Sequence, residues 1–354
     1  MKYMQPRPSS IVAALYTARD LEVGVSVLHG PSGCSFKHAR LLEEDGMRVL
    51  TTSLADNEFI FGGQEPLVAA LRYAEEEFSP ERMAVIGTCV SMIIGEDLAS
   101  AIDQSGITTP VIPVDIHAGF PENIDGVIAT LIPAADAGWI SEEELERQKF
   151  LLARANEVER IRGAASHAYI EPSRGDLKHK VAESLLREVE QGHRGIAIMN
   201  AKKETAYMFA DELIALHDVC PGADITYCAN LEERGLPKVR RDATRIKAAC
   251  CDAGVPLGLV GALDEYGAIG EQIGEKIKET NPDFAFIVGV PHAVPPEYTE
   301  GIRCYSVTNG PRQVAPLKEA GHQFVVVEID LHPKTLGVRH VVESEFGAVL
   351  RSLA

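Results

Sequence analysis

The stretch VGVSVLHGPSGCSFKHARLLEEDG, residues 23–46, contains the structural unit that decides the fold. It begins with an apolar run rich in valine, which is typical of a strand buried on both faces. A turn rich in glycine and proline follows, and then a segment whose apolar residues recur at helical spacing. A buried strand that leads directly into a helix predicts a parallel sheet with helices on its faces.

The same alternation continues over most of the chain. In the first half we expect strands at residues 23–30, 47–54, 82–89 and 109–116, helices at 11–21, 34–46, 65–78 and 92–104, and a loop at 55–64. In the second half we expect strands at residues 194–200, 223–229, 256–262, 283–290, 302–307 and 323–331. Ser9 or Ser10 is suited to cap the first helix. The pattern predicts two open α/β sheets of parallel strands.

The charge pattern divides the chain into three parts. Residues 141–190 are rich in charged side chains at helical spacing and carry no strand signal. A chain of 354 residues suits two domains of ordinary size. We therefore expect a Rossmann-like N-terminal domain over residues 1–140, a helical bridge over 141–190 and a second Rossmann-like domain over 191–354.

The composition excludes several classes of protein. The formal net charge of -18 argues against a nucleic-acid-binding protein, because such proteins need a basic face. No apolar run is long enough to cross a membrane, and the opening MKYMQPRPSS lacks the apolar core of a secretory signal, so we expect a cytoplasmic protein. The one basic stretch, KVRRDATRIK at residues 238–247, is interpreted as a solvated helix face, with an anionic ligand as the alternative.

Two of the seven cysteines occupy equivalent places. Cys34 and Cys89 each follow a predicted strand and precede a predicted helix, which is where open parallel sheets bind their ligands. A helix N-terminus is expected to lower the pKa of a thiol and so to favour the thiolate that binds iron. The alternative is that both are small buried hydrophobic residues.

Two thiolates are too few for a cubane iron–sulfur cluster, which takes four. A two-fold axis through the site would supply Cys34 and Cys89 twice, so this count predicts a homodimer with a cluster on its axis. The other cysteines lack metal-site spacing and are interpreted as core or incidental residues: Cys220, Cys228, Cys250, Cys251 and Cys304. The chain contains no Walker motif, so any ATP is expected to be hydrolysed by another protein.

Three motifs carry a family resemblance. HGPSGC at residues 29–34, DNEFIFGG at 56–63 and GTCVSMIIGEDL at 87–98 resemble, in order and spacing, the cluster-binding core of nitrogenase component 1 and its reductase relatives. The resemblance implies that Cys34 and Cys89 are iron–sulfur ligands. No cysteine precedes Cys34, whereas nitrogenase subunits carry a further ligand there. An eight-iron cluster of the nitrogenase type is therefore not expected, and neither is an iron–molybdenum cofactor.

The short chain with two ligand cysteines is similar to the branch of this family that acts on nickel tetrapyrroles. The closing stretch EIDLHPKTLGVRHVVESEFGAVLRSL, residues 328–353, resembles the same branch. The resemblance implies a homodimer with an interfacial [4Fe-4S] cluster. It also implies a separate reductase, similar to the nitrogenase iron protein, that binds ATP and Mg and delivers electrons.

The reaction implied by this resemblance is a reductive cyclisation. The substrate is Ni-sirohydrochlorin a,c-diamide, whose macrocycle is reduced while a side chain closes to a γ-lactam in coenzyme F430 biosynthesis. Nickel enters only as part of that substrate. Two alternatives stay open: a nitrogenase-like reductase of another tetrapyrrole or small molecule, and a scaffold that holds a cluster or cofactor without turnover.

Further residues are candidates for proton transfer and substrate binding. His38 is expected one helical turn after Cys34 and is a candidate proton donor. Asp56 and Glu58 either supply protons or cap a turn, and we prefer the cap. The candidates for substrate binding are histidines at predicted strand ends, and lysine and arginine side chains suited to carboxylates: His117, His292, Lys37, Arg40, Arg240 and Arg241.

Overall fold

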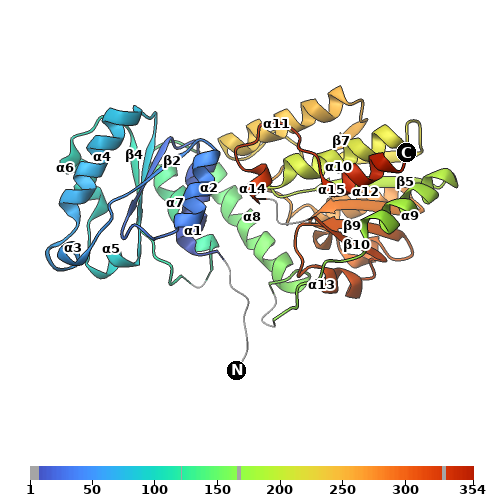
Figure 1. The fold of residues 1–354 in the computed structure, drawn as a ribbon, viewed down its shortest axis with the longest axis horizontal. Helices are drawn as coiled ribbons and strands as arrows, with labels where there is room; N and C mark the ends of the chain where they lie inside the picture. The colour runs from blue at the N-terminus through green and yellow to red at the C-terminus, as the bar shows by residue number, and fades with distance from the viewer. Residues whose placement is uncertain (1–7, 121, 166–168, 329–331) are drawn as a thin grey trace. The chain divides into compact units, whose positions relative to one another are not determined.

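A computed structural model describes residues 8–120, 122–165, 169–328 and 332–354. The chain forms two compact units (Figure 1). The N-terminal unit comprises Pro6–Lys149 and Leu236–Lys238, and the C-terminal unit comprises Phe150–Gly235 and Val239–Ala354. Most of the opening MKYMQPRPSS, and Ile329–Leu331 of the closing stretch, lie outside the described residues.

The N-terminal unit is built on a four-stranded parallel sheet in the order β2-β1-β3-β4. Its strands are β1 (Val25–His29), β2 (Arg48–Thr51), β3 (Met83–Gly87) and β4 (Val111–Val114). Every residue of the central strands β1 and β3 is buried, as expected for apolar runs covered on both faces. The four predicted strands are thus confirmed.

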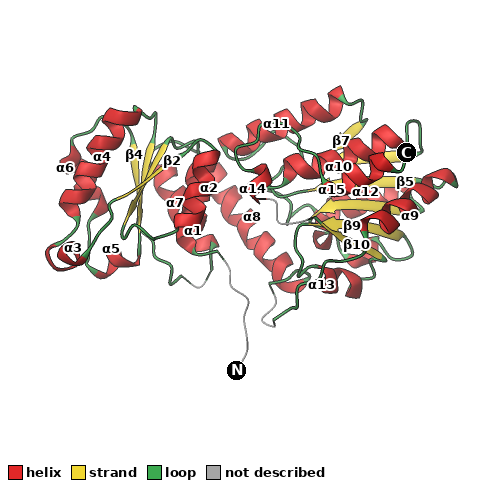
Figure 2. Ribbon diagram, in the orientation of Figure 1, coloured by secondary structure: helices red, strands yellow, loops and turns green. Residues whose placement is uncertain are grey.

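Helices cover both faces of this sheet, with α4 and α6 on one face and α1 and α7 on the other (Figure 2). The helices of this part of the chain are α1 (Ser10–Asp20), α2 (Phe36–Glu44), α3 (Asp56–Phe61), α4 (Gln64–Phe78), α5 (Cys89–Ile93), α6 (Leu98–Ser105), α7 (Ile124–Asp136) and α8 (Glu142–Ile161). The Ser9 hydroxyl caps α1 by accepting a hydrogen bond from the Val12 amide at 3.4 Å.

The C-terminal unit is built on a six-stranded parallel sheet in the order β10-β9-β8-β5-β6-β7. Its strands are β5 (Gly195–Asn200), β6 (Ile225–Ala229), β7 (Leu257–Leu259), β8 (Phe284–Gly289), β9 (Arg303–Thr308) and β10 (Phe324–Val327). Its helices are α9 (Lys178–Glu190), α10 (Ala206–Val219), α11 (Pro237–Asp252), α12 (Gly270–Thr280), α13 (Val314–Glu319), α14 (His332–Thr335) and α15 (Glu345–Ser352), with 3-10 turns η1 (Pro291–Ala293) and η2 (Pro296–Tyr298). All six predicted strands form, which confirms the predicted fold class.

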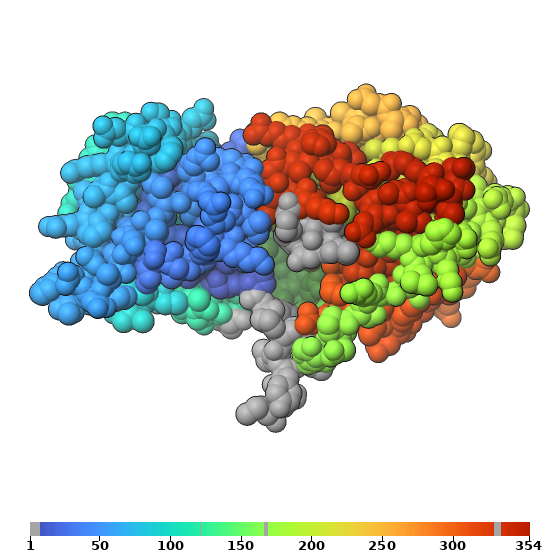
Figure 3. Space-filling model, viewed as in Figure 1, coloured from blue at the N-terminus to red at the C-terminus, as the bar shows by residue number. Residues whose placement is uncertain are grey.

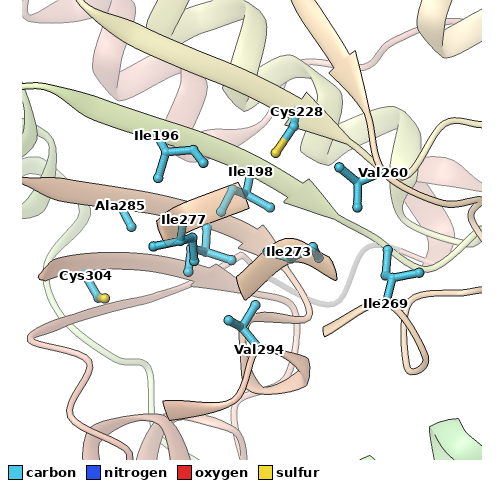
Figure 4. Packing of buried hydrophobic residues seen from close by; sticks show 11 residues of the cluster. Ile196, Ile198, Cys228, Val260, Ile269, Ile273, Ile277, Ala285, Val294 and Cys304 are labelled. Carbon is cyan, nitrogen blue, oxygen red and sulfur yellow. The ribbon is translucent and has the colours of Figure 1, made fainter. Parts of the chain in front are cut away.

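The core of the C-terminal unit is a cluster of isoleucine, valine and cysteine side chains between the sheet and α12 (Figure 4). Cys228 from β6 and Cys304 from β9 belong to this cluster. Burial raises the pKa of each of these thiols to about 12. Cys250 in α11 is buried as well, with a pKa raised to about 12 by the same cause. These three thiols therefore fill core space, as the sequence predicted.

The predicted helical bridge, residues 141–190, contains two separate helices, α8 and α9. α8 contains the point at which the chain passes from one unit to the other. α9 packs against α15 on the C-terminal unit, where Figure 3 shows the two segments (green and red) side by side. α9 is therefore part of the second sheet's helical layer, although the exact three-part division of the chain stays a prediction.

Two local predictions were wrong. The predicted loop at residues 55–64 contains the short helix α3. Its apolar residues Phe59, Ile60 and Phe61 are consecutive and exposed, so the sequence lacks the apolar spacing of an amphipathic helix. The single helix predicted at 92–104 is two helices, α5 and α6. The break occurs because Gly95 is left-handed, with φ 73°, and the Asp97 carboxylate caps α6 by accepting from the Ser100 amide at 2.9 Å.

The described helices include none that is both long and apolar enough to span a bilayer.

A buried histidine precedes β10. His322 is 2% exposed, and its Nδ1 lies 2.6 Å from the Ser306 hydroxyl of β9. Burial lowers the pKa of His322 to about 4, and the charges of His292 and Lys318 contribute in the same direction. The unfolded chain, with a histidine pKa of about 6.5, therefore binds more protons than the folded protein between those two values.

This difference predicts the pH dependence of stability. Neutral His322 makes its full contribution to the free energy of unfolding above about pH 6.5. This contribution falls by about 3 kcal/mol at most as the pH is lowered toward 4. Replacing His322 with glutamine should flatten this part of the profile, as measured by urea unfolding at each pH. His179→Gln, in the exposed part of α9, is the control and should leave the profile unchanged. An unchanged profile in His322→Gln would contradict the assignment.

Candidate metal centre

Three strand ends meet at one edge of the N-terminal sheet. β1 and β3 pair in parallel with His29 opposite Gly87, and β3 pairs with β4 with Ile86 opposite Val114. The segments that follow these strands therefore leave the sheet at the same edge, where α/β proteins bind their ligands. Cys34 lies in the first of these segments and Cys89 in the second.

The Cys34 turn is held by backbone hydrogen bonds. The Cys34 amide donates to the Pro31 carbonyl at 3.0 Å. Ser35, the next residue, is left-handed with φ 55°, and α2 begins only at Phe36. Cys34 is consequently outside the helix and half-buried, which leaves part of its side chain exposed.

Cys89 is the first residue of α5 and is also half-buried. Its sulfur accepts a hydrogen bond from the Ala118 amide at 3.3 Å, in the loop after β4. That loop is tied to α1, because the Ser10 hydroxyl donates to the His117 carbonyl at 2.5 Å. An amide aimed at the sulfur stabilises negative charge on it, which is the form that binds metal.

The two thiols lie close enough to interact electrostatically. Burial raises the pKa of Cys34, and the charge of Cys89 raises it further. The pKa of Cys34 is therefore shifted in the opposite direction to the one expected at a helix N-terminus, and burial is the largest cause. Two thiolates side by side repel each other, and a shared cationic centre removes that repulsion.

A cross-strand hydrogen bond fixes the spacing of the two cysteine turns. The Thr88 hydroxyl donates to the His29 carbonyl at 2.9 Å and joins the ends of β3 and β1. This contact needs a glycine at position 30, since an added Cβ there would lie 2.3 Å from the Thr88 Oγ1 atom. The Thr88 amide in turn donates to the Ser91 hydroxyl at 2.7 Å, inside α5.

A second network connects all three sequence motifs. The Glu96 carboxylate accepts from the Gly63 amide at 2.5 Å and lies 3.6 Å from Nε2 of the buried His29. The other ring nitrogen, Nδ1, lies 3.1 Å from the Thr52 hydroxyl. Burial lowers the pKa of His29, while Glu96 opposes that shift. His29, Thr88 and Glu96 were not predicted as functional residues, although each lies within one of the three motifs.

The donors at this edge suit an iron–sulfur cluster. Cysteine thiolates are the usual ligands of such clusters, and an amide that donates to a ligand sulfur is typical of their surroundings. Within the described part of a single chain, no group of three or more histidine, cysteine, aspartate or glutamate side chains is placed to hold a metal ion. A [4Fe-4S] cluster needs four such ligands, of which Cys34 and Cys89 would supply two.

Apolar side chains lie exposed on the segments that bear these cysteines. Phe36 begins α2, two residues after Cys34, and Met92 and Ile93 lie on α5 with Cys89. Ile60 and Phe61 of α3, 73% and 84% exposed, precede the Gly63 amide that binds Glu96. Figure 1 shows α3 and α5 at the same end of this unit. We call Phe36, Phe59, Ile60, Phe61, Met92 and Ile93 the apolar rim, a feature typical of a protein interface.

Among the predicted histidines, the structure brings His117 to this edge. It is adjacent to Ala118, whose amide reaches the Cys89 sulfur. Its Nδ1 accepts from the Gly119 amide at 3.0 Å, and its ring stacks on Phe120 with centroids 4.5 Å apart. Nε2 is therefore the nitrogen that carries the exchangeable proton in neutral His117.

The geometric basis for His38 is wrong. The prediction placed it one helical turn after Cys34, but α2 starts at Phe36, and the His38 ring packs edge-on against Tyr16 of α1 at 6.0 Å. Glu58 accepts from the Ala55 amide at 2.8 Å, which confirms the preferred role as a cap. Asp56 is exposed in the first turn of α3.

The basic candidates are dispersed. Lys37 and Arg40 lie exposed on α2, where Arg40 pairs with Glu43 at 3.4 Å. Arg240 and Arg241 lie on the exposed face of α11. His292 is buried in η1 of the C-terminal unit. A catalytic or binding role for any of these residues stays a prediction.

The N-terminal unit carries a domain of the nitrogenase component 1 type. The family model described as "Nitrogenase component 1 type Oxidoreductase" matches residues 9–130, which include both cysteines and all three motifs. The C-terminal unit lies outside this match.

Curated relatives match over nearly the whole chain. Component CfbD of the Ni-sirohydrochlorin a,c-diamide reductive cyclase complex of Methanosarcina acetivorans is 53% identical, over 99% of this chain and 97% of that protein. The protein of the same description from Methanothermobacter thermautotrophicus is 46% identical over 98% of each chain. The one from Methanocaldococcus jannaschii is 43% identical over 98% of this chain and 97% of its own. The chain therefore belongs to the CfbD family.

The Thr88 hydrogen bond gives a test of this geometry. Thr88→Val keeps the side-chain volume but removes the hydroxyl that reaches the buried end of β1. We expect it to lower the free energy of unfolding by about 1–3 kcal/mol, measured by urea unfolding, and to reduce the iron retained after anaerobic purification.

Thr88→Ser is the matched control, because it keeps the hydroxyl and loses only a methyl group. It should retain iron as the wild type does. A valine variant as stable and as rich in iron as the serine variant would show that this hydrogen bond does not position the cysteines.

Proposed function

We propose that this protein is the catalytic component of a reductive cyclase that converts Ni-sirohydrochlorin a,c-diamide and closes its γ-lactam ring in coenzyme F430 biosynthesis. The identity of 43–53% to CfbD proteins along nearly the whole chain supports the substrate. The observation that carries the reaction class is the pair of half-buried thiols, Cys34 and Cys89, at one sheet edge beneath an amide donor. A paired thiol site of this kind is suited to electron transfer.

The proposed cluster is shared by two copies of the chain. Each copy supplies Cys34 and Cys89, which completes four thiolates around one [4Fe-4S] cluster. The apolar rim around these cysteines supports the same arrangement, since a second copy on a two-fold axis would cover it. Ile60, Phe61 and Ile93 are more than 70% exposed in the single chain, so their burial would contribute favourably to association.

A cluster bound there would accept and pass on electrons one at a time. The chain's own residues do the rest: the Ala118 amide stabilises charge on the Cys89 sulfur, and the Thr88 hydroxyl keeps the two turns in register. His117 is the proposed proton donor on this side, because its Nε2 is the protonated nitrogen. Lys37, Arg40, Arg240 and Arg241 stay candidates for substrate carboxylates.

Electrons are proposed to come from a separate reductase similar to the nitrogenase iron protein, which binds and hydrolyses ATP with Mg. The CfbD relatives are components of a reductive cyclase complex, which supports a partner component here. We place the reaction in the cytoplasm, whose reducing conditions suit the proposed thiolate ligands Cys34 and Cys89.

The test uses the anaerobically purified protein with the reductase, ATP, Mg and Ni-sirohydrochlorin a,c-diamide. Wild type should form the reduced, lactam-containing product, detected by absorbance and mass. Cys34→Ser and Cys89→Ser should lose the cubane EPR signal and turnover together. Cys251→Ser, at an exposed cysteine of α11, is the matched control and should keep both.

Two outcomes would contradict this proposal. Turnover by a variant without iron would exclude the cluster from the reaction. A cluster that is retained and reduced without any conversion of the nickel tetrapyrrole would instead indicate a scaffold, or a reductase of another substrate.

The apolar rim gives a separate prediction about assembly. Ile60→Asp and Ile93→Asp each place a charge in the proposed interface and should shift the protein from dimer to monomer, measured by anaerobic sedimentation velocity. Leu177→Asp, at a position 67% exposed before α9, is the control and should remain dimeric. Dimers in both rim variants would show that another surface holds the copies together.

A further inference from the structure

The C-terminal unit contains a pocket that the cluster chemistry does not use. Its volume is about 520 Å³, which is within the range of small-molecule sites. It lies between the end of α8, the η1 segment and α13, and all of its lining residues belong to the C-terminal unit. Arg160, Arg162 and His292 supply its basic side chains, His322 adds an imidazole whose pKa burial lowers to about 4, and Glu319 is the one acidic residue among the described lining residues.

Among these side chains, His292 gives the strongest indication that the pocket binds a ligand. It is 5% exposed, and its Nδ1 has no hydrogen-bond partner among the described residues. Its Nε2 lies 3.4 Å from the Glu159 carboxylate, an ion-pair distance without hydrogen-bond geometry. A buried imidazole that lines a pocket with an unpartnered nitrogen is costly unless a ligand supplies the partner.

The negative charge of Glu159 does not cancel the positive charge of the pocket, because the Glu159 carboxylate is already paired with other donors. Its carboxylate accepts from the Lys202 ammonium at 2.9 Å and from the Gln313 amide at 3.1 Å. Lys202, His292 and these hydrogen bonds outweigh burial and keep the pKa of Glu159 well below its usual value. Glu159 therefore faces Nε2 of His292 at ion-pair distance, and Nδ1 is left for another partner.

Arg162 adds a second donor without a partner. Its Nε is buried and makes no hydrogen bond to the described residues. Glu271 and Glu297 act on its charge through space, but burial is the larger effect and lowers the pKa of the guanidinium. Arginine stays protonated in proteins, so a cation with an unused donor lies in the wall of this pocket.

Apart from Tyr169, the rest of the lining is apolar. Ile161, Ile170 and Val294 contribute aliphatic surface, together with proline and alanine side chains of η2 and α13. A site that combines arginine and histidine donors with an apolar wall suits an organic anion better than a hydrated inorganic one. Arginine forks also match the geometry of carboxylates.

We propose that this pocket binds a carboxylate-bearing organic ligand through Arg162 and His292, and that the ligand is an acidic side arm of the nickel tetrapyrrole. The identity of the ligand rests on the proposed function, whereas the carboxylate chemistry rests on the pocket alone. Arg162 and His292 are binding residues in this assignment, and Glu159 is a positioning residue for His292.

Equilibrium binding tests this inference without any need for turnover. Ni-sirohydrochlorin a,c-diamide is titrated anaerobically with the purified full-length protein and followed by its visible absorbance, and citrate is titrated separately by calorimetry. Arg162→Gln and His292→Gln should each raise the Kd for the tetrapyrrole by about tenfold or more, because each removes a charged or buried hydrogen bond. Arg162→Lys should recover part of the loss.

Arg174→Gln is the matched control, since Arg174 is an exposed arginine of the same unit that does not line the pocket. It should bind as the wild type does. Thermal unfolding of each variant, with Arg162→Lys as the milder change, separates lost binding from lost folding.

The results separate this inference from the proposed function. Wild type that binds the tetrapyrrole, with Arg162→Gln and His292→Gln binding equally well and no citrate bound, would overturn the pocket assignment and leave the proposed function intact. A second outcome is that the wild type does not bind the tetrapyrrole but binds citrate, and that this binding depends on Arg162. This result would indicate that the pocket binds the carboxylate of a free metabolite. It would also show that the proposed substrate is wrong.

Discussion

The hydrogen bond from the Thr88 hydroxyl to the His29 carbonyl is the constraint on which the proposed metal centre depends. It joins the ends of two buried parallel strands whose following turns carry Cys34 and Cys89. It is possible only because residue 30 has no Cβ, which would otherwise collide with the threonine. Glu96 then ties the second motif to the first through Gly63 and His29. The three motifs are thus one connected structure, and its result is a pair of interacting thiols with exposed surface.

The same structure supports the proposal that a second chain completes the metal site. Burial and the charge of Cys89 raise the pKa of Cys34, and the described residues of one chain offer no third ligand beside the two thiols. The surrounding side chains are apolar and exposed, which favours contact with another protein surface. Ligand count and surface chemistry therefore point to the same partner, a second copy. The basic pocket belongs to the other unit and is built from different elements, so redox chemistry and carboxylate recognition are assigned to separate parts of the chain.

The sequence predicted the sheets well, because β1, β3 and the strands of the second unit are buried apolar runs between turn signals. It failed where local geometry departs from periodicity: Ser35 adopts a left-handed conformation and removes His38 from the face of Cys34, and α3 exposes its apolar residues and so resembles a loop. The pair of cysteines was predictable from strand-end positions. The pocket was not, since Arg162, His292 and His322 come from distant segments that only the folded chain brings together.

Native mass spectrometry of the anaerobically isolated protein tests the central claim most directly, because it weighs the chains and the cluster together. The account predicts a species of two chains that carries one [4Fe-4S] cluster and that loses the cluster when its subunits separate. A complete cluster on a single chain, or a dimer with one cluster on each chain, would contradict the claim that Cys34 and Cys89 of two copies share one site.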